Sequence, residues 1–191
     1  MITTVAARQF GFTLIELMVT LVLAALILTI AVPSFRTFVQ DTQLTTTVNE
    51  LVGDMNLTRS EAVKNGAGAT LCKRNAAGTA CDTSAAWDAG WIVFSDIDGD
   101  ATIDAGDGDL LLRVHESLLA ELDVTFGQNR VTYDSRGAAS GFIGTIVVCD
   151  DRGAGEARGL ILSNTGRLRR AQDTNSNGTE EDGSGNELTC P

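Results

Sequence analysis

Acidic residues between positions 96 and 107 have the spacing of a calcium-binding loop. Oxygen-bearing residues occupy positions 1, 3, 5, 7, 9 and 12 of such a loop, namely Asp96, Asp98, Asp100, Thr102, Asp104 and Asp107. Carboxylates at this spacing, together with the Thr102 carbonyl, can converge on one hard cation. Two residues depart from the pattern, because Ala101 replaces the glycine of position six and Asp107 replaces a longer glutamate. The alternative to a calcium site is a solvated acidic turn.

A short basic segment, Gly166-Arg167-Leu168-Arg169-Arg170, is the second candidate site. In a strand, Arg167 and Arg169 would point to one face, where their guanidinium groups could hold successive phosphates of a nucleic acid. The net charge of −11 argues against a general attraction to nucleic acid. The nearby acids Glu180, Glu181 and Asp182 could instead neutralise the arginines. The alternative to a DNA site is therefore an exposed basic strand end.

Catalytic chemistry has no residue support in this sequence. His115 is the only histidine, so a His-rich metal site is not available, and we expect it to end a strand. No glycine-rich phosphate loop follows a strand in the required context. Trp87 and Trp91 flank a turn and are expected to pack in the core or at its rim. We expect neither an enzyme nor a required cofactor.

The N-terminal region carries a single acid in an apolar run of membrane length. The run from Phe12 to Val32 would form about 32 Å of helix, enough to cross a bilayer core of about 30 Å. Glu16 within it costs about 2.5–3.5 kcal/mol on insertion scales, so a partner is expected. Gly11 precedes the run and Arg8 supplies positive charge on the cytoplasmic side. Cleavage at the glycine would therefore leave the helix attached, unlike cleavage of a secretory signal.

Helical patterning continues beyond Pro33 as an amphipathic stripe. Apolar residues recur at spacings of three and four, with one turn skipped, at Leu44, Val48, Leu51, Val52, Met55, Ala62 and Val63. The helix is expected to end near Asn65-Gly66. This spacing predicts a helix that lies on a sheet.

Residues 67–191 have the composition of an antiparallel β domain. Short apolar runs alternate with glycine-rich turns and predict strands at 69–73, 91–95, 110–115, 122–126, 131–133, 143–149, 159–162 and 168–170. The polar, acidic stretch from Asp173 to Glu187 is expected to be either a mobile loop or a loop ordered by tethering.

The four cysteines predict two disulfides, because an even number in a translocated domain indicates an oxidising periplasm. Three pairings are possible. We favour Cys72–Cys81, which closes a short loop, and Cys149–Cys190, which would tether the C-terminal tail.

The N-terminal region resembles the type IV prepilin leader and helix shared by type IV pilins and type II secretion pseudopilins. The resemblance rests on Arg8-Gln9-Phe10-Gly11-Phe12-Thr13-Leu14-Ile15-Glu16-Leu17, and on Pro33, where pilin helices commonly carry a kinking proline. It implies that a prepilin peptidase cuts after Gly11 and that Phe12 becomes N-methylated. It also implies that Glu16 pairs with the terminal amine of a neighbouring subunit. The expected organisation is a leader at 1–11, a transmembrane and assembly helix at 12–35 and an amphipathic helix at 36–66.

Further segments resemble the FimT/GspH group of minor pilins and pseudopilins. They are Leu57–Lys64, and Gly90–Phe94 followed by the Asp-rich turn and Leu111–Arg113. The segment Gly166–Arg170 resembles the Gly-Arg-x-Arg motif of FimT-type minor pilins associated with DNA uptake. The group implies a type IV pilin-like α+β fold, with a long N-terminal helix packed on antiparallel β-sheets. It also implies assembly by lateral packing of helices rather than catalysis.

The resemblance implies a minor subunit that primes or caps a type IV pilus-like filament. The chain would enter the bacterial inner membrane once, with a periplasmic domain, and then join a pilus or pseudopilus. Its expected partners are other pilins or pseudopilins, the prepilin peptidase, the membrane and, through Arg167, Arg169 and Arg170, DNA. The alternatives are a minor pseudopilin H of type II secretion and a DNA-binding module displayed on a pilus.

Overall fold

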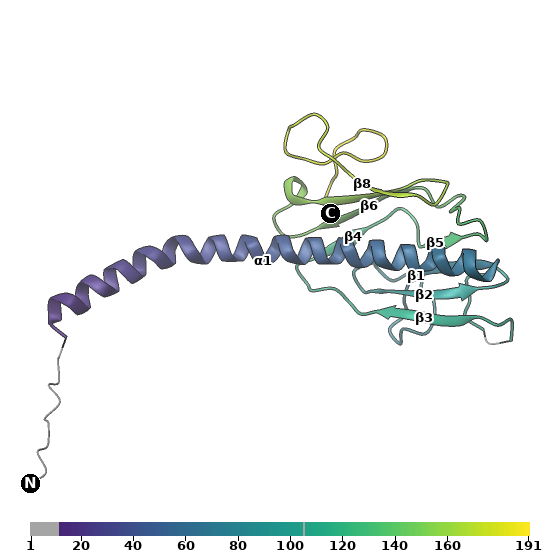
Figure 1. The fold of residues 1–191 in the computed structure, drawn as a ribbon, viewed down its shortest axis with the longest axis horizontal. Helices are drawn as coiled ribbons and strands as arrows, with labels where there is room; N and C mark the ends of the chain where they lie inside the picture. Colours follow the sequence, from purple (N-terminus) through teal and green to yellow (C-terminus); the bar gives the residue numbers. More distant parts are fainter. Residues whose placement is uncertain (1–11, 105) are drawn as a thin grey trace, which may run out of the picture. The chain divides into compact units, whose positions relative to one another are not determined.

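The computed structural model describes residues 12–104 and 106–191, so Gly11 and the preceding leader lie outside the described part. The chain divides into two compact units, Met1–Asp41 and Thr42–Pro191. Helix α1 (Leu14–Asn65) is continuous through the boundary between them (Figure 1).

The first unit contains the apolar half of α1. Thr13 caps the helix, because its Oγ1 accepts a hydrogen bond from the Glu16 backbone N–H at 3.2 Å. Pro33 lies inside the helix and lacks an N–H for the carbonyl of Thr29. Among the described residues, α1 is the one helix long and apolar enough to span a membrane, with a hydropathy of 2.6 over its most apolar stretch. Length and composition therefore agree with the predicted spanning segment.

The second unit contains two four-stranded antiparallel sheets. The first has the strand order β3-β2-β1-β5 and the second β4-β6-β7-β8. The strands are β1 (Gly68–Lys73), β2 (Trp91–Asp96), β3 (Leu110–His115), β4 (Asp123–Thr125), β5 (Arg130–Tyr133), β6 (Gly144–Cys149), β7 (Arg158–Leu162) and β8 (Leu168–Arg170). A short 3₁₀ helix, η1 (Ala154–Glu156), precedes β7. The predicted α+β class and all eight predicted strands are confirmed, with ends within two residues.

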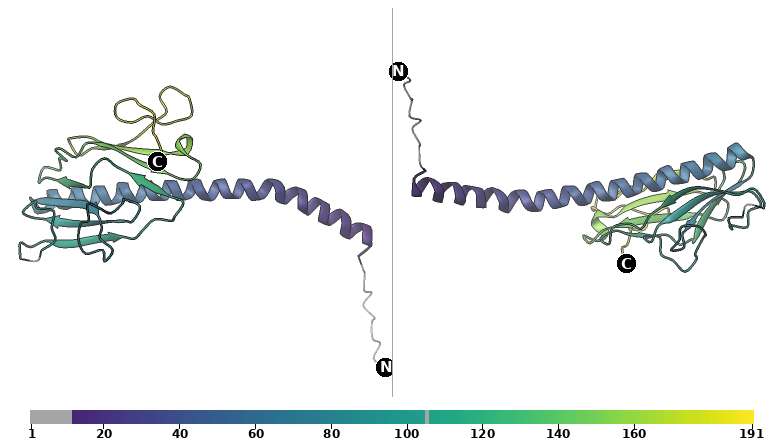
Figure 2. Two further views of the ribbon diagram at one scale, coloured as in Figure 1. Left: turned by 180° about the vertical axis from the view of Figure 1, so that it is seen from behind. Right: turned by 90° about the horizontal axis from the view of Figure 1, so that it is seen from below.

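The main core lies between the second half of α1 and both sheets. Figure 2 shows this half of the helix along one side of the sheets. Helix residues Leu44, Val48, Leu51 and Met55 pack in one cluster with residues of both sheets, which include Leu71, Val93, Val131, Ile146, Val148 and Leu160. The helix ends as predicted at Asn65, where the Ala67 N–H donates to the Ala62 carbonyl at 3.3 Å. Val63 was wrongly predicted to face the core and is half exposed.

Two smaller clusters cover the outer faces of the sheets, and each contains a disulfide. Cys72–Cys81 lies with Ile92 and Phe94 beside the first sheet, and Cys149–Cys190 lies with Leu188 beside the second. These are the two pairs that the sequence favoured. The second disulfide holds the chain end against the sheet, so the tail from Asp173 is tethered.

Candidate functional site

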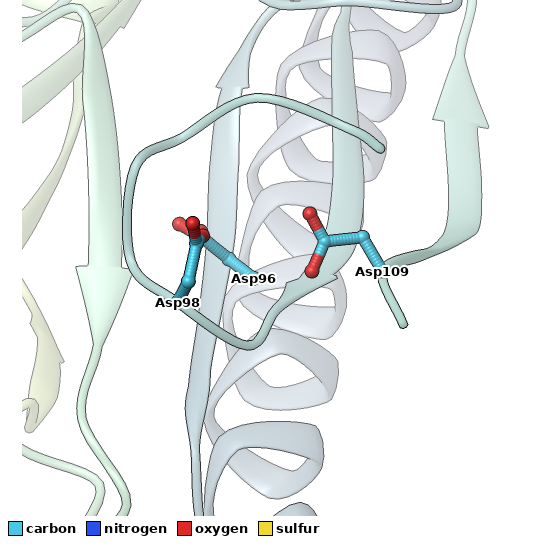
Figure 3. Close-up of side chains that lie close together, drawn as sticks. All are labelled: Asp96, Asp98 and Asp109. Atoms are coloured by element: carbon cyan, nitrogen blue, oxygen red, sulfur yellow. The ribbon is translucent and has the colours of Figure 1, made fainter. Parts of the chain in front are cut away.

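The acidic loop connects β2 to β3 and brings three carboxylates together. Ligand atoms of Asp96, Asp98 and Asp109 all lie within 4.8 Å of one another (Figure 3). Asp96 is the last residue of β2 and fully buried, and its Oδ2 accepts a hydrogen bond from Thr70 Oγ1 at 2.5 Å. Strand β2 therefore positions the first carboxylate rigidly.

Asp109 was not in the predicted set of calcium ligands. It is the residue directly before β3, and its two oxygens accept the backbone N–H groups of Ile97 at 2.9 Å and Asp104 at 3.4 Å. Its position at the base of the loop, opposite the end of β2, brings it next to Asp96. The feature of the sequence that could have identified Asp109 is its position as an acid directly before the predicted strand at 110–115.

Two of the remaining predicted ligands accept hydrogen bonds from backbone N–H groups within the loop. Asp100 accepts the Thr102 N–H at 2.6 Å, and Asp104 accepts the Asp107 N–H at 3.3 Å. The nearby negative charge of Asp104 raises the pKa of Asp107. This crowding of negative charge is what a bound cation would relieve. Calcium binding by this loop stays a prediction.

The basic segment begins with a glycine that the fold requires. Gly166 has φ +73°, and a Cβ there would lie 2.1 Å from the Gly137 carbonyl oxygen and 2.9 Å from the Tyr133 ring. The turn between β7 and β8 thus packs directly on the backbone of the 134–138 turn. Gly166 is therefore explained by packing as well as by any role in a binding motif.

Replacing Gly166 with alanine is expected to destabilise the protein by about 2–5 kcal/mol, because left-handed strain adds to the overpacking of a tight contact. Gly141→Ala is the matched control, since Gly141 has φ +86° and nothing within 4 Å of the added Cβ. The control should cost only the strain, about 1–2 kcal/mol. Urea unfolding of the purified chain measures both values, and equal losses would contradict the packing explanation.

Arg169 and Arg170 lie on the edge strand β8 and Arg167 directly precedes it, beside helix α1. Arg170 donates to Asn49 Oδ1 on the helix at 2.7 Å. Arg167, Arg169 and Arg170 line a groove together with Arg59 of α1, which donates to the Thr165 carbonyl at 3.4 Å. Arg59 was missed by sequence reasoning, because no local pattern connects it to a segment more than a hundred residues later.

That Arg167 and Arg169 point to one face stays a prediction. Strand β8 begins at Leu168, and Arg167 directly precedes it. Arg169 pairs in register with Ile161, whose side chain belongs to the cluster beneath the tail. Arg169 also lines a second groove, together with Asp182 and Glu187 of the tail.

The acids that could have neutralised these arginines have other partners. Glu180 lies 3.9 Å from Arg158 and accepts the Gly159 N–H at 2.9 Å. Asp182 accepts backbone N–H groups of its own turn, including that of Asn186, and these hydrogen bonds lower its pKa. Among the described residues, no ion pair joins Glu180, Glu181 or Asp182 to Arg167, Arg169 or Arg170.

The residues predicted for processing and assembly lie at the start of α1. Gly11 is outside the described residues, and Phe12 is 81% exposed. Glu16 is exposed in the first helical turn, where a negative charge is favourable near the helix N-terminus. Thr13 and Glu16 also have the sequence spacing of a capping box, and the Glu16 backbone N–H makes the hydrogen bond to Thr13 Oγ1 that such a box contains.

The long capped helix, its apolar N-terminal half and the two antiparallel sheets define a type IV pilin-like protein. The chain belongs to the family described as Type II transport protein GspH, whose family model matches residues 47–166, more than half of the chain. A second family model, the prokaryotic N-terminal methylation motif, matches residues 6–32. These matches agree with the resemblance seen in the sequence.

Two solved structures of the type IV minor pilin FimU of Pseudomonas aeruginosa share the fold. One is 21% identical, with a TM-score of 0.54, and the match covers 71% of this chain and 92% of the other. The second crystal form is 19% identical, with a TM-score of 0.51, and covers 68% and 93%. None of the curated proteins compared with the chain matches it significantly.

Proposed function

We propose that this chain is a minor subunit that primes or caps a type IV pilus-like filament. The observation that carries the proposal is the combination, in one chain, of the methylation motif at 6–32 and the GspH domain at 47–166. In this role, a prepilin peptidase cuts after Gly11 in the bacterial inner membrane and Phe12 is N-methylated. The apolar half of α1 then packs laterally against the helices of other subunits, and the β domain remains outside the membrane.

The type of filament is tested by identifying the subunits that co-purify with the chain. A tagged chain is expressed from its native locus, and filaments are sheared from the cells and purified through the tag. The chain is expected in the sheared fraction at far less than one copy per major subunit, together with the subunits of a single system. Pilus subunits would support a minor pilin, and secretion subunits would support the pseudopilin alternative suggested by the family description. A processed chain that stays in the membrane fraction would contradict the proposal.

DNA binding by the filament is a second candidate function. Four arginines, Arg59, Arg167, Arg169 and Arg170, around one groove favour it. Guanidinium groups suit the phosphate backbone, which attracts protein without regard to base sequence. The acidic remainder of the surface limits such binding to this groove.

The double variant Arg167→Gln with Arg169→Gln is expected to bind duplex DNA at least about tenfold more weakly at low salt. The salt dependence should fall by about one unit of slope for each lost phosphate contact. Gel shifts of the full chain in detergent measure both effects. Arg74→Gln with Arg113→Gln removes the same charge at the first sheet, away from the groove, and should bind like wild type. Equal weakening by both double variants would show that net charge alone is responsible.

A further inference from the structure

The tail contains a second segment with the residue pattern of a calcium loop. Asp173, Asn175 and Asn177 are followed by Gly178, so that D-x-N-x-N-G is complete. Glycine therefore occupies the sixth position, where the loop between β2 and β3 has alanine. Thr179 and Glu181 follow at positions seven and nine, which supply a backbone carbonyl and a side-chain oxygen in calcium loops.

The tail segment is folded as such a loop. Asp173 Oδ2 accepts the Gly178 N–H at 2.8 Å, and Asn177 Oδ1 accepts the Thr179 N–H at 2.9 Å. The Asn177 N–H donates both to Asp173 Oδ1 at 3.1 Å and to Asn175 Oδ1 at 3.0 Å. These two oxygens are consequently neighbours on one side of the turn.

In the loop between β2 and β3, side-chain oxygens accept backbone N–H groups at the same relative positions as in the tail loop. Asp96 accepts the N–H five residues later, and Asp98 and Asp100 each accept the N–H two residues later. In both loops the fourth and sixth residues have positive φ angles. The two segments therefore share one conformation, although they lie at different places in the fold.

A buried carboxylate oxygen at the tail loop has no partner. Glu181 is only 5% exposed, and its Oε2 accepts the Thr174 N–H at 2.7 Å, so its carboxylate lies against the first turn of the loop. Its Oε1 is shielded from solvent and makes no hydrogen bond to any residue that the structure describes. An anionic oxygen in this state is costly unless a cation or donor compensates it.

The base of the loop is held in place by the surrounding tail. The Glu181 N–H donates to the Gln172 carbonyl at 3.1 Å and closes the loop at its two ends. Leu188 is buried against the outer face of the second sheet, and Cys190 is bonded to Cys149. A ligand bound here would thus be held by a tethered segment.

We propose that the loop Asp173–Glu181 binds one calcium ion. Side-chain oxygens of Asp173, Asn175, Asn177 and Glu181, together with the Thr179 carbonyl, act as ligands. Calcium suits this set because it accepts neutral amide and carbonyl oxygens in flexible geometry, whereas Mg²⁺ demands a near-ideal octahedron. Two carboxylates among five ligands correspond to a weak site, with a Kd of about 10⁻⁴–10⁻³ M as in extracellular modules.

Hydrogen exchange of the full chain in detergent, measured by mass spectrometry, tests this site and separates it from the β2–β3 loop. The chain is stripped of metal by a chelator and compared without metal, with calcium and with magnesium at about 5 mM, above the expected Kd. Calcium should slow exchange of amides 174–188 at least about tenfold, and magnesium should have little effect. Glu181→Gln and Asp173→Asn should each remove this protection, whereas Glu121→Gln, an exposed acid elsewhere, should retain it.

Exchange in β1 and β2, followed in the same samples, shows whether each variant is folded, and two variants are used in case one is not. The proposal is overturned if calcium leaves the tail of the wild-type chain unprotected. It is also overturned if protection persists in the folded Glu181 and Asp173 variants, or if protection is confined to residues 96–109.

Discussion

Glu16→Ala is expected to leave the chain inserted in the membrane and cleaved, but to reduce its amount in sheared filaments at least about tenfold. The reason is that a lone acid in an apolar segment is tolerated when it has a partner, which we propose to be the Phe12 amine of the next subunit. Loss of an ion pair worth more than about 1.4 kcal/mol lowers an association constant at least tenfold. Quantitative blotting of membrane and sheared fractions measures the ratio.

Two further substitutions separate the pairing role of Glu16 from its place in the helix cap. Glu16→Gln keeps the size of the side chain and the backbone N–H that donates to Thr13 but removes the charge, so it should fail like alanine. Thr13→Ala removes the hydrogen bond from the Glu16 N–H and keeps the charge, so it should be incorporated normally. A Thr13 variant that fails as badly as Glu16→Ala would show that the cap, rather than the charge, is required.

Asp54→Ala is expected to lower the free energy of unfolding of the β-domain unit by about 2–4 kcal/mol. Asp54 is 1% exposed on α1 and accepts the Trp91 indole N–H at 2.8 Å and an Arg113 N–H at 2.6 Å. Alanine leaves the buried Trp91 N–H without an acceptor, which costs the desolvation of that group. Arg113 can turn to solvent because its side chain is half exposed, so the loss stays below that of a fully buried ion pair. Denaturant unfolding in detergent measures the change.

Glu50→Ala is the matched control for Asp54→Ala. Glu50 lies about one turn earlier on the same helix and contacts His115 at 3.0 Å, but its side chain is 46% exposed. Removing this half-exposed partner should cost less than about 1 kcal/mol. A loss at Glu50 equal to that at Asp54 would contradict the view that burial determines the difference.

Much of the fold was predictable because it depends on short-range patterns. Helix spacing identified Leu44, Val48, Leu51 and Met55 as core residues, and alternating apolar runs identified every strand. Helical and strand periodicity are properties of neighbouring residues, so a linear sequence displays them directly. The polar residues Thr47, Asp54 and Thr58 in the buried stripe were not predicted. For Asp54 the reason is that its partners, Trp91 and Arg113, lie elsewhere in the chain.

The candidate sites were predicted less completely, for the same reason. Asp96 and Asp98 were identified from spacing, but Asp109 joins them only because β2 and β3 are paired. Arg59 joins the basic groove only because α1 lies beside the edge strand β8. In the tail, the pattern of residues was visible in the sequence, but the buried oxygen of Glu181 was not.

The sequence by itself determined the apolar helix with its one acid, the methylation motif, the class of fold and the number of cysteines. These features are local in the chain, and each is a matter of residue type and spacing. The tertiary structure alone decided which acids and arginines come together and which buried oxygen lacks a partner. Such groupings depend on strand pairing and helix packing between residues distant in sequence, and no local pattern encodes the distance between two side chains from different elements.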